Sequence, residues 1–162
     1  MVKVGLQIQA DLENITNLIA SGEDFRWYLK LKCLNCGDET SWVYVCQDDK
    51  SPLKGGRGSA NLVIKCKLCS RENSIDIIEG SVGPYNIEDS ESRKYKTIVA
   101  FDCRGIEPTN FSPRIGFQAV SSESNTAFTD INLSEEDWAD YDSKKNISVG
   151  IYELQHRFIK LK

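Results

Sequence analysis

The 162-residue sequence predicts an all-β protein made of two similar, pseudo-symmetric β halves in one compact sandwich- or barrel-like unit. Apolar and polar residues alternate with period two over several short segments, as in half-buried strands. Only residues 134–141 have the capping hydroxyl and early acids of a helix start, and they allow one or two turns. Two Cys-x-x-Cys pairs lie where one expected strand ends and the next begins, which predicts a zinc-ribbon-like first half.

Strand signals run along the whole chain. Residues 3–10 alternate strictly, and residues 25–32 place four apolar side chains on one face. Further segments rich in strand-forming residues lie at 41–46, 60–65, 73–79, 95–103, 115–120, 128–133 and 149–161. Glycine and proline mark 47–58 and 104–113 as expected loops.

A weak internal repeat supports the two halves. Residues 12–18 resemble residues 106–111 with one residue dropped, and each segment follows an alternating strand. The length fits one ordinary domain. We therefore expect a single domain over 1–162. It comprises a zinc-bearing half at about 1–81, a polar connector at about 82–91 and a metal-free half at about 92–162.

The two cysteine pairs predict one zinc ion bound by Cys33, Cys36, Cys66 and Cys69. Two residues between paired cysteines let one tight turn direct both sulfurs at the same metal. Gly37 follows the first pair, where such a turn often needs positive φ. The two pairs are further apart in sequence than in most compact sites, but a long hairpin can return to the same place at little entropic cost.

Other roles for cysteine and histidine fit the pattern less well. A redox pair usually lies at a helix N-terminus, whereas Cys36 is followed by an acidic turn and a strand. Cys46 and Cys103 fall within apolar strands and are expected to be buried small hydrophobes. The single histidine, His156, is expected to be an ordinary strand residue. No catalytic constellation emerges, so we expect no enzyme activity.

The formal charge of −4 argues against general nucleic-acid binding, although a nucleic-acid-binding zinc ribbon and a metal-handling or thiol-redox protein stay open as alternatives. No apolar run has transmembrane length, and no signal-peptide core follows Met1, so we expect no membrane partner and a cytoplasmic or also nuclear monomer. A protein partner is expected. Its candidate contact residues are Lys54 and Arg57 in a glycine-rich loop and Trp138 in an acidic aromatic segment.

Longer motifs are similar to one known family. They are Asp24–Lys30, Cys33-x-x-Cys36-Gly37, Lys54–Ala60, Lys65–Cys69, Arg71–Ile75 and Ser148–Glu153. This set resembles the eukaryotic "CXXC motif containing zinc-binding protein" family over almost the whole chain. The resemblance implies a small, mostly β protein with two similar halves and zinc on the four cysteines of the two pairs, and it implies no established enzymatic activity.

Overall fold

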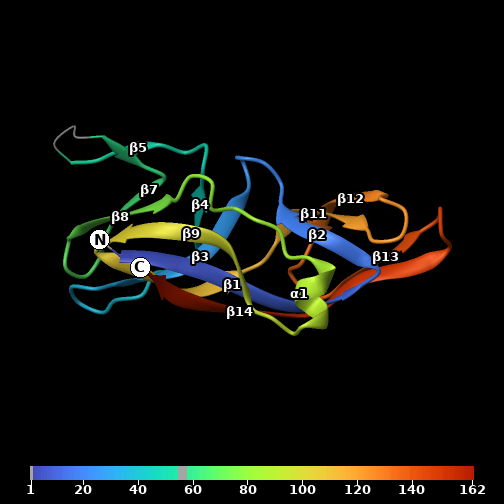
Figure 1. The fold of residues 1–162 in the computed structure, drawn as a ribbon. Coiled ribbons are helices and arrows are strands. Elements are labelled where there is room, and N and C mark those ends of the chain that lie inside the picture. The colour runs from blue at the N-terminus through green and yellow to red at the C-terminus, as the bar shows by residue number, and fades with distance from the viewer. Residues whose placement is uncertain (1, 55–57) are drawn as a thin grey trace.

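The computed structural model describes residues 2–54 and 58–162, and within them the chain forms fourteen strands and one short helix (Figure 1). The prediction of an all-β fold is confirmed. The elements are β1 (Val2–Glu13), β2 (Ile15–Ala20), β3 (Arg26–Cys33), β4 (Val43–Cys46), β5 (Ser51–Pro52), β6 (Ser59–Ala60), β7 (Leu62–Lys65), β8 (Glu72–Ile77), α1 (Ile87–Glu91), β9 (Lys96–Arg104), β10 (Ile106–Ser112), β11 (Ile115–Ser121), β12 (Ala127–Asn132), β13 (Trp138–Asp142) and β14 (Ile147–Leu161).

The largest sheet has six strands in the order β13-β14-β1-β9-β8-β7. The long strands β1 and β9 pair antiparallel at its centre, as Figure 1 shows for the blue and yellow strands. The order is symmetric about this central pair: β1 corresponds to β9, β14 to β8, and β13 to β7. The two halves of the chain therefore meet along a continuous ladder of backbone hydrogen bonds.

Besides the small two-stranded sheet β5-β6, the described chain forms two three-stranded sheets, in the orders β10-β3-β4 and β2-β11-β12. Each of the three-stranded sheets takes one strand from one half of the chain and two from the other. The elements correspond in chain order, with β1, β2, β3, β4, β7 and β8 matching β9 to β14. Each half therefore contributes its second strand to the small sheet of the other half, and the halves interleave.

The junction between the first two strands of each half has the same geometry. Asn14 (φ 53°) joins β1 to β2, and Gly105 (φ 77°) joins β9 to β10. Ile15 pairs with Ser121 as Ile106 pairs with Cys33. The structural repeat thus aligns Ile15 with Ile106, so the alignment of residues 12–18 with 106–111 from the sequence has the wrong register.

One hydrophobic core joins the six-stranded sheet and both three-stranded sheets. It includes Leu6 of the large sheet, Trp27 and Leu31 of one small sheet, and Phe117 and Ile131 of the other. These side chains alternate with outward-facing residues along their strands, as the period-two pattern predicts. The shared core makes the metal-bearing end part of one packed unit.

Two local predictions are wrong. Residues 134–141 do not form a helix; β13 lies there and pairs with β14. Residues 104–113 are not a loop, because β10 occupies most of them and pairs with β3. The short helix lies instead at α1, where the backbone N–H of Asn86 donates to the carboxylate of Asp89. Across the described ranges, no helix has the length and apolar character needed to cross a membrane.

Candidate metal centre

Two similar turns carry the paired cysteines. Cys33 is the last residue of β3, and the N–H of Gly37 donates to its carbonyl at 2.8 Å. Cys66 directly follows β7, and the N–H of Ser70 donates to its carbonyl at 2.9 Å. Gly37 and Ser70 both have positive φ, 81° and 63°. The second turn therefore reaches the same backbone shape without glycine, at some cost in strain.

The turns bring four sulfur atoms together. The Sγ atoms of Cys33, Cys36, Cys66 and Cys69 all lie within 4.8 Å of one another. Cys33 Sγ is 3.8 Å from Cys69 Sγ, and Cys36 Sγ is 3.5 Å from Cys66 Sγ. A zinc ion with Zn–S bonds of about 2.3 Å in a tetrahedron requires sulfur separations of about 3.8 Å. The donor set and its spacing therefore fit one zinc ion, and no cysteine in the described chain is in a disulfide.

Hydrogen bonds shift the pKa values of the clustered thiols in different directions. The backbone N–H of Cys36, with smaller effects from Asn35 and Asn73, lowers the pKa of the Cys33 thiol to about 6 against the opposing effect of burial. The side chain of Asn35 and the N–H of Arg71 likewise lower the pKa of Cys69.

Cys36 behaves in the opposite way. The N–H of Asp38 acts to lower its pKa, but desolvation and hydrogen bonds with the three neighbouring sulfurs outweigh it and raise the pKa to about 12. Four thiols this close cannot all lose their protons without a compensating cation, because the resulting negative charges repel one another. A divalent metal supplies that charge and displaces the remaining protons.

Asn73 of β8 is a buried residue that contacts the cysteine cluster through Cys33. Its side chain is 2% exposed, and its Nδ2 donates to Cys33 Sγ at 3.6 Å. Its Oδ1 is buried without a hydrogen-bond partner in the described chain. A Cβ on Gly105 would lie only 2.2 Å from this oxygen, so glycine at the β9–β10 junction leaves room for the amide. Asn73 is a positioning residue that the sequence analysis did not single out.

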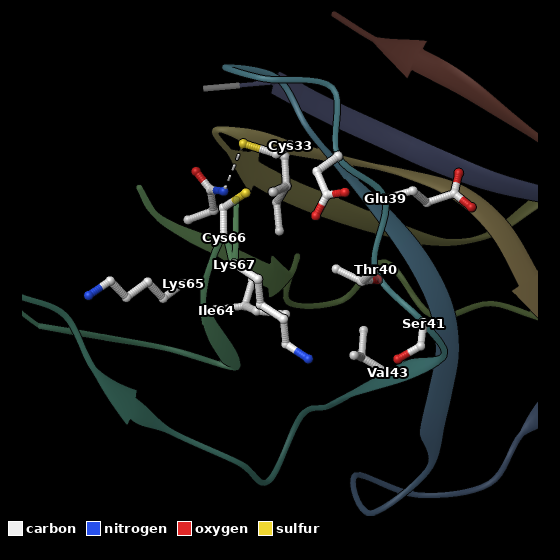
Figure 2. Close-up of a pocket in the computed structure, with 12 residues that line it drawn as sticks. Cys33, Glu39, Thr40, Ser41, Val43, Ile64, Lys65, Cys66 and Lys67 are labelled. Carbon is white, nitrogen blue, oxygen red and sulfur yellow. Dashed lines mark hydrogen bonds between the residues drawn. The ribbon is translucent and has the colours of Figure 1, made fainter. Parts of the chain in front are cut away.

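A cavity of about 280 Å³ adjoins the metal centre. Figure 2 shows Cys33 and Cys66 on one side of it and Thr40 and Val43 on another, and the dashed line at Cys33 is the bond from Asn73. Its remaining lining is mixed: Asp38, Glu39, Ser41, Ile64, Lys65, Lys67 and Ile106. Two of the four cysteines, Cys33 and Cys66, thus line this cavity.

The second half repeats both turns without cysteine. The N–H of Ser121 donates to the carbonyl of Thr126 as that of Cys33 donates to Asp38, both at 2.8 Å. Likewise, Trp138 pairs with Ile151 as Leu62 pairs with Ile75. Counting along these registers, Ser121 and Ser124 take the places of the first cysteine pair, and Asp142 and Lys145 those of the second.

A hydrogen-bonded cluster, Ser121, Ser124, Thr126 and Asp142, closes this second pair of turns. Asp142 is fully buried, and its carboxylate accepts from the hydroxyls of Ser121 at 2.6 Å and of Ser124. Thr126 and the N–H of Lys144 donate to its other oxygen at 3.4 and 3.0 Å. The Ser121 and Ser124 hydroxyls lower the pKa of Asp142. A carboxylate and its donors thus occupy the place that four sulfurs occupy in the first half.

The predicted contact residues are not brought to the metal centre. Lys54 is exposed, and its backbone N–H donates to Glu72 at 3.1 Å. Arg57 lies outside the described residues. Trp138 is half-buried, with its ring 5.6 Å from that of Phe128, and packs against the core.

The remaining thiols and the histidine lie in packed environments. Cys46 and Cys103 are buried, and burial raises the pKa of Cys103 to about 12. His156 lies in β14 between the rings of Phe111 and Phe158, at 5.7 and 5.9 Å, and burial lowers its pKa.

Comparison with known proteins agrees with this geometry. A eukaryotic family described as "CXXC motif containing zinc binding protein" matches residues 5–159. Proteins with that description from Xenopus laevis and Homo sapiens are 60% and 59% identical over 161 residues, covering 99% of this chain and of each relative. The crystal structure of C1orf123 superposes with a TM-score of 0.93 at 58% identity, covering 98% of this chain and 99% of that one. A hypothetical protein from Plasmodium falciparum shares the fold, with a TM-score of 0.88 at 24% identity, over 98% of this chain and all of that one.

Proposed function

This chain belongs to the eukaryotic family of CXXC motif containing zinc binding proteins, and from that premise we propose that it is a non-enzymatic protein whose zinc ion supports a surface for a protein partner. The zinc would be structural, because all four ligands come from the chain and leave no open coordination position. The first half would then act as a zinc-ribbon-like scaffold.

The observation that carries this proposal is an exposed leucine on each cysteine turn. Leu34 and Leu68 are 47% and 70% exposed, each between the two cysteines of its pair. The corresponding positions in the metal-free half are Ser122 and Lys144. The polar turns of the second half demonstrate that this backbone shape does not require leucine. We call Leu34 and Leu68 the leucine tips.

Zinc would hold the two leucine tips in fixed positions. Burying the exposed parts of both side chains against a partner is worth about 2–3 kcal/mol, which corresponds to roughly a 30- to 150-fold change in affinity. Without the metal, the two turns repel one another or separate, and the ordering cost of docking rises.

The test is affinity capture with zinc-loaded protein, read by mass spectrometry. Proteins retained by the wild type should be lost with Leu34→Ser/Leu68→Ser, which keeps the cysteines, and with Cys33→Ser, which removes the metal. Ser122→Ala/Lys144→Ala on the corresponding turns is the matched control and should retain them. Identical retention by wild type and the leucine variant would rule the proposal out.

A metal-handling role is a second candidate, favoured by the exposure of Cys36 and the half-buried state of Cys66 and Cys69. Thiolates reachable from solvent can pass zinc to a competing ligand. Rapid zinc transfer to a mild chelator from the folded protein would favour this role, and slow release would favour the structural one.

A further inference from the structure

The solvent face of the sheet β10-β3-β4, together with Arg114 just after β10, carries cations in contact with aromatic rings. The guanidinium carbon of Arg114 lies 3.8 Å from the ring centroid of Tyr28, and that of Arg26 lies 4.5 Å from the centroid of Tyr44. The two tyrosine rings are 5.7 Å apart on directly paired residues. These side chains, together with Lys30 and Trp42, whose ammonium and ring are 5.2 Å apart, form what we call the cation–aromatic face.

Two of the three rings on this face are exposed to solvent, whereas Tyr28 is half-buried. Trp42 and Tyr44 are 38% and 36% exposed, which places them among the large apolar side chains that the described chain leaves uncovered. The opposite face of β3 carries the buried Trp27 and Leu29. The exposed rings therefore do not contribute to the hydrophobic core, and they lie on the outer side of a rigid sheet.

In the part of the chain that the structure describes, no carboxylate lies within 4.0 Å of the cations on this face. Within residues 2–54 and 58–162, the one ion pair closer than 4.0 Å joins Lys96 to Asp89, far along the chain. Lys30 and the two arginines, Arg26 and Arg114, contact rings instead. Their charge is thus not taken up by a direct ion pair and can act on an anionic partner.

The second half shows that the sheet does not need these residues in order to fold. The sheet β2-β11-β12 has the same strand arrangement. Counting from Ser121 along β11 and from Ile131 along β12, the positions of Tyr28, Lys30, Trp42 and Tyr44 correspond to Gly116, Gln118, Asp130 and Asn132. The same scaffold therefore forms with no ring and no cation at these four places, although Arg26 corresponds to Arg114, which is also a cation. The three rings and the Lys30 ammonium of the first half are thus not needed for the sheet to form and are left for binding.

We propose that the cation–aromatic face binds single-stranded nucleic acid. Unpaired bases stack on exposed aromatic rings and on guanidinium planes, while cations beside them neutralise the phosphates. An acidic peptide would use the cations but would leave the row of rings without a matching partner. This face shares no residue with the leucine tips, so the proposal does not depend on the proposed protein interaction.

The chemistry sets the expected size of the effects. Stacking one base on one ring changes affinity by about 5- to 150-fold. If three cations neutralise three phosphates, raising salt from about 50 to about 200 mM weakens binding of a single strand by about 20-fold. Removing rings at constant charge and removing charges at constant rings should therefore give separable losses.

The experiment measures fluorescence anisotropy of a short labelled oligouridine with zinc-loaded full-length protein at low ionic strength. Trp42→Ser/Tyr44→Ser removes two rings and keeps the charge, and it should weaken binding at least about fivefold. Its matched control is Tyr141→Ser, which removes a 51% exposed ring from the acidic strand β13 and should leave binding unchanged.

A charge variant completes the design. Arg26→Gln/Lys30→Gln should weaken binding and reduce its salt dependence, whereas Lys144→Gln/Lys145→Gln, on a turn of the second half, should do neither. Thermal melting of each variant checks that the fold is intact. No binding by the wild type at low ionic strength would overturn the proposal. So would equal binding by the ring variant, or an acidic peptide or heparin binding as tightly as oligouridine.

Discussion

Replacing Asn73 with valine should separate the stability of the fold from the affinity for zinc. Valine is the residue at the corresponding place in the second half, Val149, which is fully buried, so the site can hold a branched apolar side chain. The substitution removes the Nδ2 donor to Cys33 Sγ and also the buried Oδ1 that has no partner in the described chain. These two losses act in opposite directions.

Their magnitudes follow from the contacts. Losing a hydrogen bond to a charged sulfur costs about 1.5–3 kcal/mol when the metal is bound, and removing a group that orients a ligand weakens metal binding by about 10- to 100-fold. Removing an unpartnered buried oxygen returns about 1–3 kcal/mol to the metal-free fold. We therefore expect Asn73→Val to keep or raise the unfolding free energy measured with chelator, while zinc affinity falls.

Competition with a chromogenic chelator measures the zinc affinity, and urea unfolding in excess chelator measures the metal-free stability. Asn73→Asp should weaken zinc binding further, because it replaces a donor with a negative acceptor beside the thiolates. Ser74→Ala is the control, since neighbouring residues of a strand point to opposite faces. If both Asn73 variants bind zinc as tightly as the wild type, the support role of this amide is refuted.

Three further outcomes test the metal centre and its metal-free counterpart. Cys66→Ser should lose zinc, measured by elemental analysis, and lower the unfolding free energy by at least about 3 kcal/mol in one cooperative transition; full metal content with unchanged melting would contradict it. Acid should destabilise the second half: the pKa of Asp142 lies below its usual 3.8 in the fold, so its contribution is present above that pH and is lost as the pH falls further. Urea midpoints should drop below about pH 4, and Asp142→Asn should flatten that drop. A variant with cysteines at the four corresponding positions should bind two zinc ions per folded chain instead of one, measured by native mass spectrometry; its substitutions are Ser121→Cys, Ser124→Cys, Asp142→Cys and Lys145→Cys. A count of one ion would reject the correspondence between the two pairs of turns.

The metal cluster was predictable because its signal is local. Two cysteines two residues apart form one turn wherever they occur, and two such turns suffice for a tetrahedral site. Asn73 had no such signal, since its role depends on pairing between β8 and β9 and on the space left by Gly105. Long-range pairing of this kind cannot be read from the spacing of residues.

The wrong local predictions share a cause. Pro108 favours a loop, but β10 is an edge strand of its sheet, where a missing N–H is tolerated. Ser134 and the acids after it favour a helix start, but a helix of one or two turns is marginal alone, and β13 gains a full ladder against β14. In both places, tertiary pairing outweighs local propensity.

The interleaved halves explain why one metal can matter to the whole molecule. Because β2 belongs to the small sheet of the second half and β10 to that of the first, neither half can unfold without breaking a sheet of the other. The first half closes its turns with zinc, and the second closes them with the Asp142 carboxylate and its donors. A chelator therefore removes stabilisation at the four-cysteine site, and acid removes it at the Asp142 cluster. Because the two halves unfold as one cooperative unit, either loss lowers the unfolding free energy of the whole fold.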